Sequence, residues 1–206
     1  MAELTLSVRP DLARSPLAHL KATLAQGAVS GDRGVSLREI PFLTMVSVRI
    51  APGSPQAARL AHVLGADMPA ACGRVSTGPQ SDVLWLGPDE FLVISENDAT
   101  QLTEQLTEAL GDSPGLVVDL SANRTTLELS GPSARAVLEK GCSVDLHPRE
   151  FAPGMAVVTQ VGAAPVVLWQ TDDAPTYRVF PRASFAHYTA LWLLDSMVEF
   201  AEPEVP

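Results

Sequence analysis

Apolar residues along the chain follow strand-like and helix-like spacings, and these patterns predict its elements. Residues 42–50 (FLTMVSVRI) are apolar and β-branched, which predicts a strand. The breaker-rich residues 52–55 then open a helix. The apolar residues on one predicted face of that helix are Ala57, Leu60, Ala61 and Leu64. The runs VLWL (83–86) and FLVI (91–94) flank Gly-Pro-Asp-Glu, which is typical of a hairpin turn.

A second helix is expected after this hairpin. Asp98 and Gln101 have the spacing of a capping box, which marks its start. The apolar residues that we expect it to bury are Leu102, Leu106, Ala109 and Leu110. The first half of the chain therefore reads strand, helix, hairpin, helix.

The second half repeats this order. Residues 126–129 alternate as a strand, and Gly131 and Pro132 open a helix buried through its apolar positions. The runs VVLW (166–169) and YRVF (177–180) flank a turn. We expect a last helix that is capped by Ser184. Its apolar residues are Phe185, Tyr188, Leu191, Trp192 and Val198.

Matching residues support an internal duplication. The stretch GSPQAARLAHVLG (53–65) has the outline of GPSARAVLEKG (131–141), and Trp85 and Trp169 end equivalent strands. We infer an α+β fold in which two β-α-β-β-α units, each ferredoxin-like, pack as one domain.

This pattern divides the chain into four parts. Residues 37–115 and 116–200 form the two units, and residues 201–206 form an acidic tail. Residues 1–36 form an N-terminal arm with too little apolar pattern to build a core of its own. We expect this arm to wrap a partner.

Composition narrows the classes of partner. The net charge of −10 argues against nucleic acid and anionic membranes, which both attract surfaces rich in Lys and Arg. No apolar run approaches the roughly 20 residues of a membrane span, and the first residues lack the layout of a signal peptide. Cys72 and Cys142 form no CxxC motif, which is typical of reduced thiols. We therefore expect a cytoplasmic protein.

One stretch, SGPSARAVLEKGCSVDLHP, places catalytic residue types close together. The sequence around Ser133 lacks the second glycine of a nucleophile elbow, so we expect Ser133 to be an ordinary residue of the first helical turn. Cys142 and His147 lie close together around Asp145, whereas catalytic Cys and His partners are usually distant in sequence. We interpret them as a small apolar side chain and a loop histidine.

The sequence also lacks the motifs that hold metals and nucleotides. The four histidines are scattered singly: His19, His62, His147 and His187. None belongs to HxxxH or HExxH, and the glycines of residues 27–34 do not form a dinucleotide or phosphate loop. We expect no metal site and no cofactor site in this chain.

The remaining candidate is DLSANR, residues 119–124. Asp119, Ser121, Asn123 and Arg124 follow an apolar pair that we expect to be buried, so they could present a carboxylate and donors to a ligand at a strand end. They are equally the residue types of a turn, since Asp, Ser and Asn bond back to nearby backbone. The turn preferences favour the second interpretation, and both stay open.

Several blocks of the chain, in order, resemble one family. They are RSPL, WLGPDEFLVI, VVDLSANRTTLELSGPSARAVLEKGCSVDLHPREFAPGM and FAHYTALWLLDSMVEF. Together they cover nearly the whole chain and resemble the gamma subunit of heterotetrameric sarcosine oxidase. That family is similar in fold to the folate-binding aminomethyltransferase of the glycine cleavage system, so the resemblance implies a folate-binding-transferase-like fold.

The resemblance also implies an activity and partners. The complex oxidises sarcosine to glycine and hydrogen peroxide, and the methyl carbon passes to tetrahydrofolate. FAD, FMN and NAD are implied for the alpha and beta subunits and zinc for the delta subunit, with no cofactor in gamma. The alpha subunit is implied as the main partner, with beta and delta in the same complex.

The resemblance leaves Asp119 as the residue to test. Asp119-Leu120-Ser121 matches the D-x-S motif of the aminomethyltransferase, in which the aspartate acts on the folate-bound substrate. The transferase then has a longer segment with Gly-Gly and paired aspartates, whereas VTQVGAAPVVLWQTDD here is short and apolar. We therefore expect a non-catalytic structural subunit with no catalytic residue. The alternatives are a small folate-dependent one-carbon transferase using Asp119 and a stand-alone module for a small ligand.

Large aromatic side chains are candidate anchors for the core or for an interface. They are Trp85, Trp169, Trp192 and Phe200.

Overall fold

The computed structural model describes residues 12–202 and contains two five-stranded antiparallel sheets. The first sheet has, in spatial order, β3 (Val75–Thr77), β4 (Ser81–Gly87), β5 (Glu90–Ser95), β2 (Thr44–Arg49) and β6 (Leu116–Asp119). The second has β1 (Ser36–Ile40), β7 (Thr126–Ser130), β10 (Thr176–Pro181), β9 (Ala164–Asp172) and β8 (Met155–Val161). The α-helices are α1 (Lys21–Gln26), α2 (Pro55–Leu64), α3 (Ala99–Leu110), α4 (Ala134–Glu139) and α5 (Ala183–Met197). Short 3-10 helices precede α1, as η2 (Ala18–Leu20), and follow α5, as η3 (Val198–Ala201).

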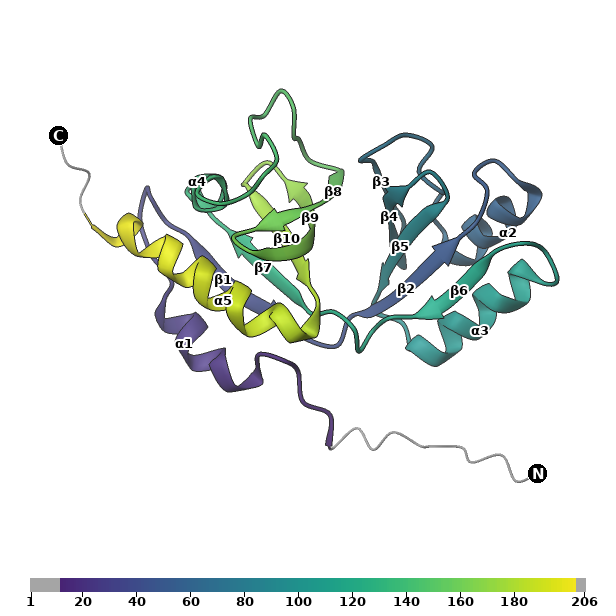
Figure 1. Ribbon diagram of the computed structural model, residues 1–206, viewed down its shortest axis with the longest axis horizontal. Helices are drawn as coiled ribbons and strands as arrows, with labels where there is room; N and C mark the ends of the chain where they lie inside the picture. Colours follow the sequence, from purple (N-terminus) through teal and green to yellow (C-terminus); the bar gives the residue numbers. More distant parts are fainter. Residues whose placement is uncertain (1–11, 203–206) are drawn as a thin grey trace.

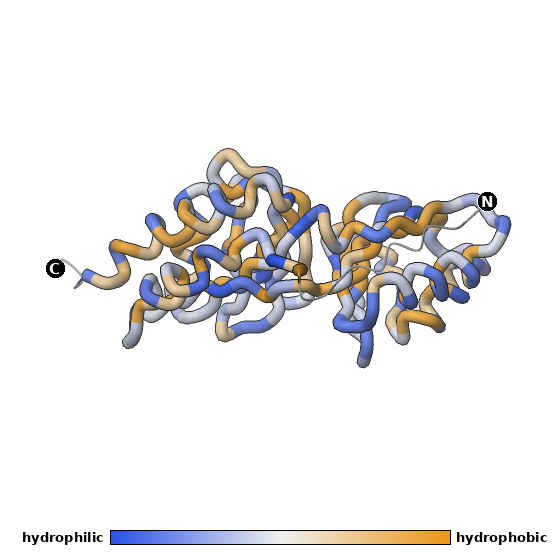
Figure 2. The backbone as a smooth tube through the Cα atoms, turned by 90° about the horizontal axis from the view of Figure 1, so that it is seen from below, coloured by the Kyte–Doolittle hydropathy of each residue, from blue (hydrophilic) through white to orange (hydrophobic). Residues whose placement is uncertain are grey.

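The two sheets face each other, and the helices cover their outer sides (Figure 1). Helices α2 and α3 cover the first sheet, and α5 lies across the second with α1 beside it. Seen from below, the molecule is elongated, with hydrophobic stretches in both halves (Figure 2). The α+β class with two sheets is as the sequence predicted.

Each sheet has the strand order of a ferredoxin-like unit plus one extra edge strand. In the first sheet β6, β2, β5 and β4 lie side by side, and β3 extends the sheet beyond β4. In the second sheet β1, β7, β10 and β9 take the same places, and β8 extends it. The place that β6 fills at the end of the first unit is thus filled in the second by β1, from the start of the chain.

This arrangement differs from the predicted division of the chain. We placed residues 116–200 together in the second unit, yet β6 pairs with β2, with Val46 opposite Asp119. Strand β1, which we placed in the first unit, pairs with β7, with Ser36 opposite Ser130. Repeat spacing cannot show this pairing, because each edge strand joins the sheet of the other half. The boundaries of the duplication itself stay a prediction.

Three apolar clusters form the core. The first lies between the second sheet and its helices and includes Leu127, Leu129 and Tyr177, all fully buried. The second lies under α2 and α3. The third joins the sheets to each other, through residues such as Met45 and Phe180. Because strand side chains alternate between faces, the same strands supply an outer core and an inner contact.

Local signals at the helix starts are confirmed in the first unit and wrong at α5. The Asp98 carboxylate accepts from the Gln101 N–H at 2.9 Å, as the capping box predicted. Helix α5, in contrast, begins at Ala183 after Arg182 and has no side-chain cap, so Ser184 lies inside the helix. A serine in a first turn is therefore not a sufficient signal for its start.

Part of the predicted arm belongs to the fold. Leu17, Leu20 and Leu24 are buried in the core of the second sheet, where they pack with Leu37 and Leu129. Residues 17–24 thus build no core of their own but complete the core of the second unit, a contact that the division at residue 36 did not predict. Residues 1–11 and 203–206, which include most of the predicted tail, lie outside the described residues.

The aromatic candidates belong to the core rather than to an exposed surface. Trp169 and Phe200 are buried, and Trp85 and Trp192 are partly buried against the two outer clusters. None of the helices in residues 12–202 has both the length and the apolarity needed to cross a membrane.

Candidate functional site

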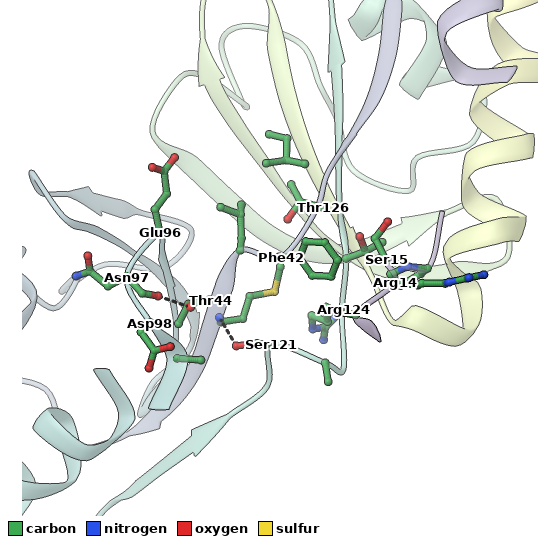
Figure 3. A pocket seen from close by; sticks show the side chains of 18 residues that line it. Arg14, Ser15, Phe42, Thr44, Glu96, Asn97, Asp98, Ser121, Arg124 and Thr126 are labelled. Atoms are coloured by element: carbon green, nitrogen blue, oxygen red, sulfur yellow. Dashed lines mark hydrogen bonds between the residues drawn. The ribbon is translucent and has the colours of Figure 1, made fainter. Parts of the chain in front are cut away.

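The DLSANR tract crosses from the first sheet to the second, and its start forms a turn. Asp119 ends β6, and its Oδ1 accepts from the backbone N–H of Ser121 at 2.8 Å and from its hydroxyl at 2.5 Å. The Ser121 hydroxyl oxygen in turn accepts from the Met45 N–H at 3.1 Å (Figure 3). One oxygen of the Asp119 carboxylate therefore holds a local turn, which is the simpler of the two sequence interpretations.

The end of the tract is tied to the second sheet. Arg124 Nη1 donates to the Phe180 carbonyl at 2.8 Å, and the Asn123 carbonyl accepts from the Ala183 N–H at 2.8 Å. Burial lowers the pKa of the Arg124 guanidinium, and the positive charge of Arg182 lowers it further. Arg124 through its side chain and Asn123 through its backbone carbonyl thus brace the crossover between the sheets.

Two separate cavities divide the residues of the tract between them. Ser121 and Arg124 line a cavity of about 550 Å³ between the N-terminal segment, the start of β2 and the start of α3 (Figure 3). Asp119 instead lines a shallow depression along α3, together with Glu104 and Glu108. The carboxylate and the hydroxyl of the D-x-S motif therefore bond to each other, while the two residues line different cavities.

The charges that line these cavities can be compared with those of a reduced folate, the ligand that the one-carbon transferase alternative requires. The depression beside Asp119 is lined by three carboxylates and by threonines, without a cation. A reduced folate carries carboxylates of its own, so this lining repels it. The other cavity contains Arg14 and Arg124 with Glu96 and Asp98, and Arg124 already donates to the Phe180 carbonyl.

The other sequence candidates are held apart by their own contacts. Ser133 is buried at the N-cap position of α4 and makes no side-chain cap. Cys142 Sγ lies 4.0 Å from Thr159 Oγ1, and His147 Nδ1 accepts from the Arg149 N–H at 3.2 Å. No hydrogen bond joins this cysteine and histidine, and their interpretation as scaffold residues stays a prediction.

Two of the histidines that look scattered in the sequence meet in the structure. His19 Nε2 lies 2.9 Å from His187 Nδ1, and the rings stack with centroids 5.2 Å apart. Sequence could not pair them, since η2 and α5 lie at opposite ends of the chain. Within residues 12–202 no three His, Cys, Asp or Glu side chains gather as a metal site would require.

A charged cluster between the sheets also escaped the sequence analysis. Arg38 donates to Glu128 at 2.8 Å through Nε, and Arg178 Nε lies 3.6 Å from the same carboxylate. The Arg178 guanidinium also lies over the Trp169 ring at 5.2 Å. Burial raises the pKa of the nearby Asp82 carboxyl, and Arg178 partly opposes this rise. The strand alternation predicted for residues 126–129 was the available signal, because with Leu127 in the outer core it puts Glu128 on the opposite, inter-sheet face.

Comparison with known proteins identifies the family. The model of the sarcosine oxidase, gamma subunit family matches residues 51–199. The sarcosine oxidase subunit gamma of Corynebacterium sp. (strain U-96) is 47% identical over 206 residues, which is 100% of both chains. This chain belongs to that family. A second member, the sarcosine oxidase subunit gamma of an Arthrobacter species, is 48% identical, also over 100% of both chains.

Solved structures agree with the family. A chain of heterotetrameric sarcosine oxidase from Corynebacterium sp. U-96, in complex with pyrrole 2-carboxylate, matches with a TM-score of 0.90 at 47% identity. The match covers 95% of this gamma-family chain and 100% of the other. Aminomethyltransferase T of the glycine cleavage system from Bartonella henselae matches with a TM-score of 0.64 at 19% identity, over 90% of this chain and 58% of the transferase. The second match shows a shared fold.

Proposed function

We propose that this chain is a structural, non-catalytic gamma subunit of a heterotetrameric sarcosine oxidase. The observation that carries the proposal is the full-length similarity to gamma subunits, at 47% identity, together with a TM-score of 0.90 to a chain of such a complex. The geometry of the D-x-S tract supports the non-catalytic part, because Asp119 and Ser121 bond to each other and to backbone.

The rest of the complex completes the proposal. The alpha subunit is the main partner, and beta and delta belong to the same assembly in the cytoplasm. FAD, FMN, NAD and zinc lie in those other subunits. There sarcosine is oxidised by oxygen to glycine and hydrogen peroxide, and the methyl carbon passes to tetrahydrofolate. The role of this chain is to stabilise the assembly, and the apolar surface described in the next subsection supports such a role.

The competing function is a folate-dependent one-carbon transferase using Asp119. A general acid or base contributes about 10²–10⁴-fold to a rate, so the Asp119→Asn variant separates the two functions. We expect the assembled complex with Asp119→Asn to oxidise sarcosine and form methylenetetrahydrofolate within about twofold of the wild-type rate.

Ser121→Ala is the matched control, because it removes the hydroxyl that donates to Asp119 Oδ1 but keeps the carboxylate and the backbone N–H bond of the turn. A rate at least about a hundredfold lower for Asp119→Asn, with Ser121→Ala unaffected, would establish the transferase. Titration of the isolated chain with tetrahydrofolate provides a second readout, and saturable binding that Asp119→Asn abolishes would contradict the structural role. A wild-type chain that elutes alone when co-expressed with the other subunits would contradict the subunit assignment itself.

A further inference from the structure

Helix α5 is apolar on more of its surface than its own fold covers. Among its fifteen residues, ASFAHYTALWLLDSM, Asp195 is the one with a full charge. The buried face packs on the second sheet and consists of Ala186, Thr189, Ala190, Leu193, Ser196 and Met197. A helix that is hydrophobic all round is normally buried on all sides. Here the outer side of α5 lies at the surface (Figure 1).

The uncovered apolar residues lie along one flank of this helix. We define the α5 flank as Phe185, Tyr188 and Leu191 of α5 together with Val198, the first residue of η3; their exposed fractions are 38%, 40%, 42% and 62%. Near 100° per residue, the three α5 positions lie on one side of the helix, away from the buried face, and Val198 follows directly after the helix ends. They are four of the nine large hydrophobic side chains exposed in residues 12–202.

The other long helices show that this flank is unusual within the molecule. Helix α3 buries Leu102, Leu106 and Leu110, and its outer side carries glutamates, glutamines and threonines. Helix α2 likewise buries Leu60 and Leu64, and its exposed residues, Pro55, Ala58, Arg59 and His62, include no large hydrophobic side chain. A concentration of exposed apolar residues on one helix marks an interaction surface, whereas isolated ones do not.

The flank is held in place before any partner arrives. The Tyr188 hydroxyl oxygen accepts from the Ala163 N–H at 3.0 Å, which fixes the ring against the β8–β9 turn. Gly162 in that turn has a φ of 57°, and a Cβ there would lie 2.7 Å from the Tyr188 hydroxyl oxygen. A rigid helix with a fixed aromatic ring loses little conformational freedom on binding.

Charge defines the chemistry of the partner. Asp195 is exposed and lies between Leu191 and Val198 along the flank, and it forms no ion pair within residues 12–202. The neighbouring Glu199 is paired with Lys140 at 3.0 Å. A partner that covers the flank would bury the Asp195 carboxylate, so it must supply a cation there. A second copy of this chain is disfavoured, because each copy has a net charge of −10.

We propose that the α5 flank docks this chain on another subunit of the oxidase. The docking surface of that subunit is apolar and presents one Lys or Arg to Asp195. The inference rests on the proposed function, and it adds which surface of the chain carries the assembly.

The test measures association in the assembled complex. The other subunits are co-expressed with wild type, Leu191→Glu, Asp195→Lys or the control Leu116→Glu. Leu116 is 47% exposed on β6, in the other half of the molecule, so it matches the change in exposure and charge. We expect Leu191→Glu and Asp195→Lys each to raise the dissociation constant of this chain from the rest of the complex at least about tenfold. We expect Leu116→Glu to change the same constant less than about twofold. Circular dichroism of each isolated variant confirms that the fold is retained.

Each outcome has a distinct meaning. Normal assembly of both α5 variants overturns the inference and leaves the proposed function intact, as does a loss of assembly confined to Leu116→Glu. If wild type itself does not assemble, the proposed function fails. Sedimentation of the isolated chain gives the last check: we expect a monomer, and a dimer that Leu191→Glu dissociates would assign the flank to a second copy.

Discussion

Glu39 joins the N-terminal segment to the crossover between the sheets, and its removal is the sharpest test of that attachment. Its carboxylate accepts three hydrogen bonds: from the Ser15 hydroxyl at 2.6 Å, the Leu17 N–H at 3.2 Å and the Thr125 hydroxyl at 2.7 Å. Leu17 and Thr125 are buried, so water does not readily replace the lost acceptor. Glu39→Ala therefore leaves two buried donors unpaired.

The size of the effect follows from these contacts. An unpaired buried donor costs about 1–3 kcal/mol, and the more exposed Ser15 contributes less. We expect Glu39→Ala to lower the free energy of unfolding by about 3 kcal/mol. Glu39→Gln keeps one oxygen where Oε1 stands, which accepts from Leu17 and Thr125, so its loss is expected to be about 1 kcal/mol.

Urea denaturation gives the free energies, and hydrogen exchange of residues 16–26 reports where the loss occurs. Faster exchange in this segment is expected for Glu39→Ala, because its anchor is gone. Glu108→Ala, on the exposed side of α3, serves as the control and should stay within about 0.5 kcal/mol of wild type. If Glu39→Ala behaves like this control in both measurements, the attachment of the segment does not depend on Glu39 and the reasoning is refuted.

Two further predictions concern the inter-sheet charge and a close backbone approach. Burial raises the pKa of Asp82, so the folded state is destabilised at pH values where this carboxyl is ionised. Asp82→Asn should therefore raise the melting temperature near pH 7, and this gain should disappear below about pH 4, where the carboxyl is protonated in both states. A gain that does not depend on pH would refute the prediction. Gly131 has a φ of 117°, and a Cβ there would lie 2.6 Å from the Gly34 carbonyl oxygen, so Gly131→Ala should cost about 3 kcal/mol or more in urea denaturation. At Gly154, with a φ of 77° and no atom within 4 Å, the same change should cost only about 1 kcal/mol, and equal costs would show that the close approach is unimportant.

Features that depend on neighbouring residues could be predicted from the sequence. The Asp98 cap, the hairpin of β4 and β5 and the buried face of α3 each need only a few adjacent positions, and the structure has all three. The pairing of β1 with β7 could not be predicted, because it joins residues that are far apart, and nothing in β1 distinguishes one sheet from the other. The pair expected to be buried before Asp119 is buried only in part, since β6 is an edge strand: Val117 is partly buried under α2 and α3, whereas Val118 is 38% exposed.

The candidate site shows where composition alone misleads. Asp119, Ser121, Asn123 and Arg124 suit a ligand site and a brace equally well, and the choice between them depends on contacts to distant backbone. The structure supplies those contacts at Met45, Phe180 and Ala183.

The sequence alone also does not show which side of α5 is exposed. Its sequence is so apolar that spacing cannot separate a face for the core from a face for a partner. The apolar residues that the sequence analysis expected on this helix include all four of the α5 flank, and its true core face includes Thr189 and Ser196. The Thr189 hydroxyl can be buried because it donates to the Phe185 carbonyl at 2.9 Å. Four of the six residues on the inner face are small, whereas the bulky Phe185, Tyr188 and Leu191 lie on the outer one. Bulky apolar side chains on the outer face cost free energy when they stay in contact with water, and they become favourable when another subunit covers them.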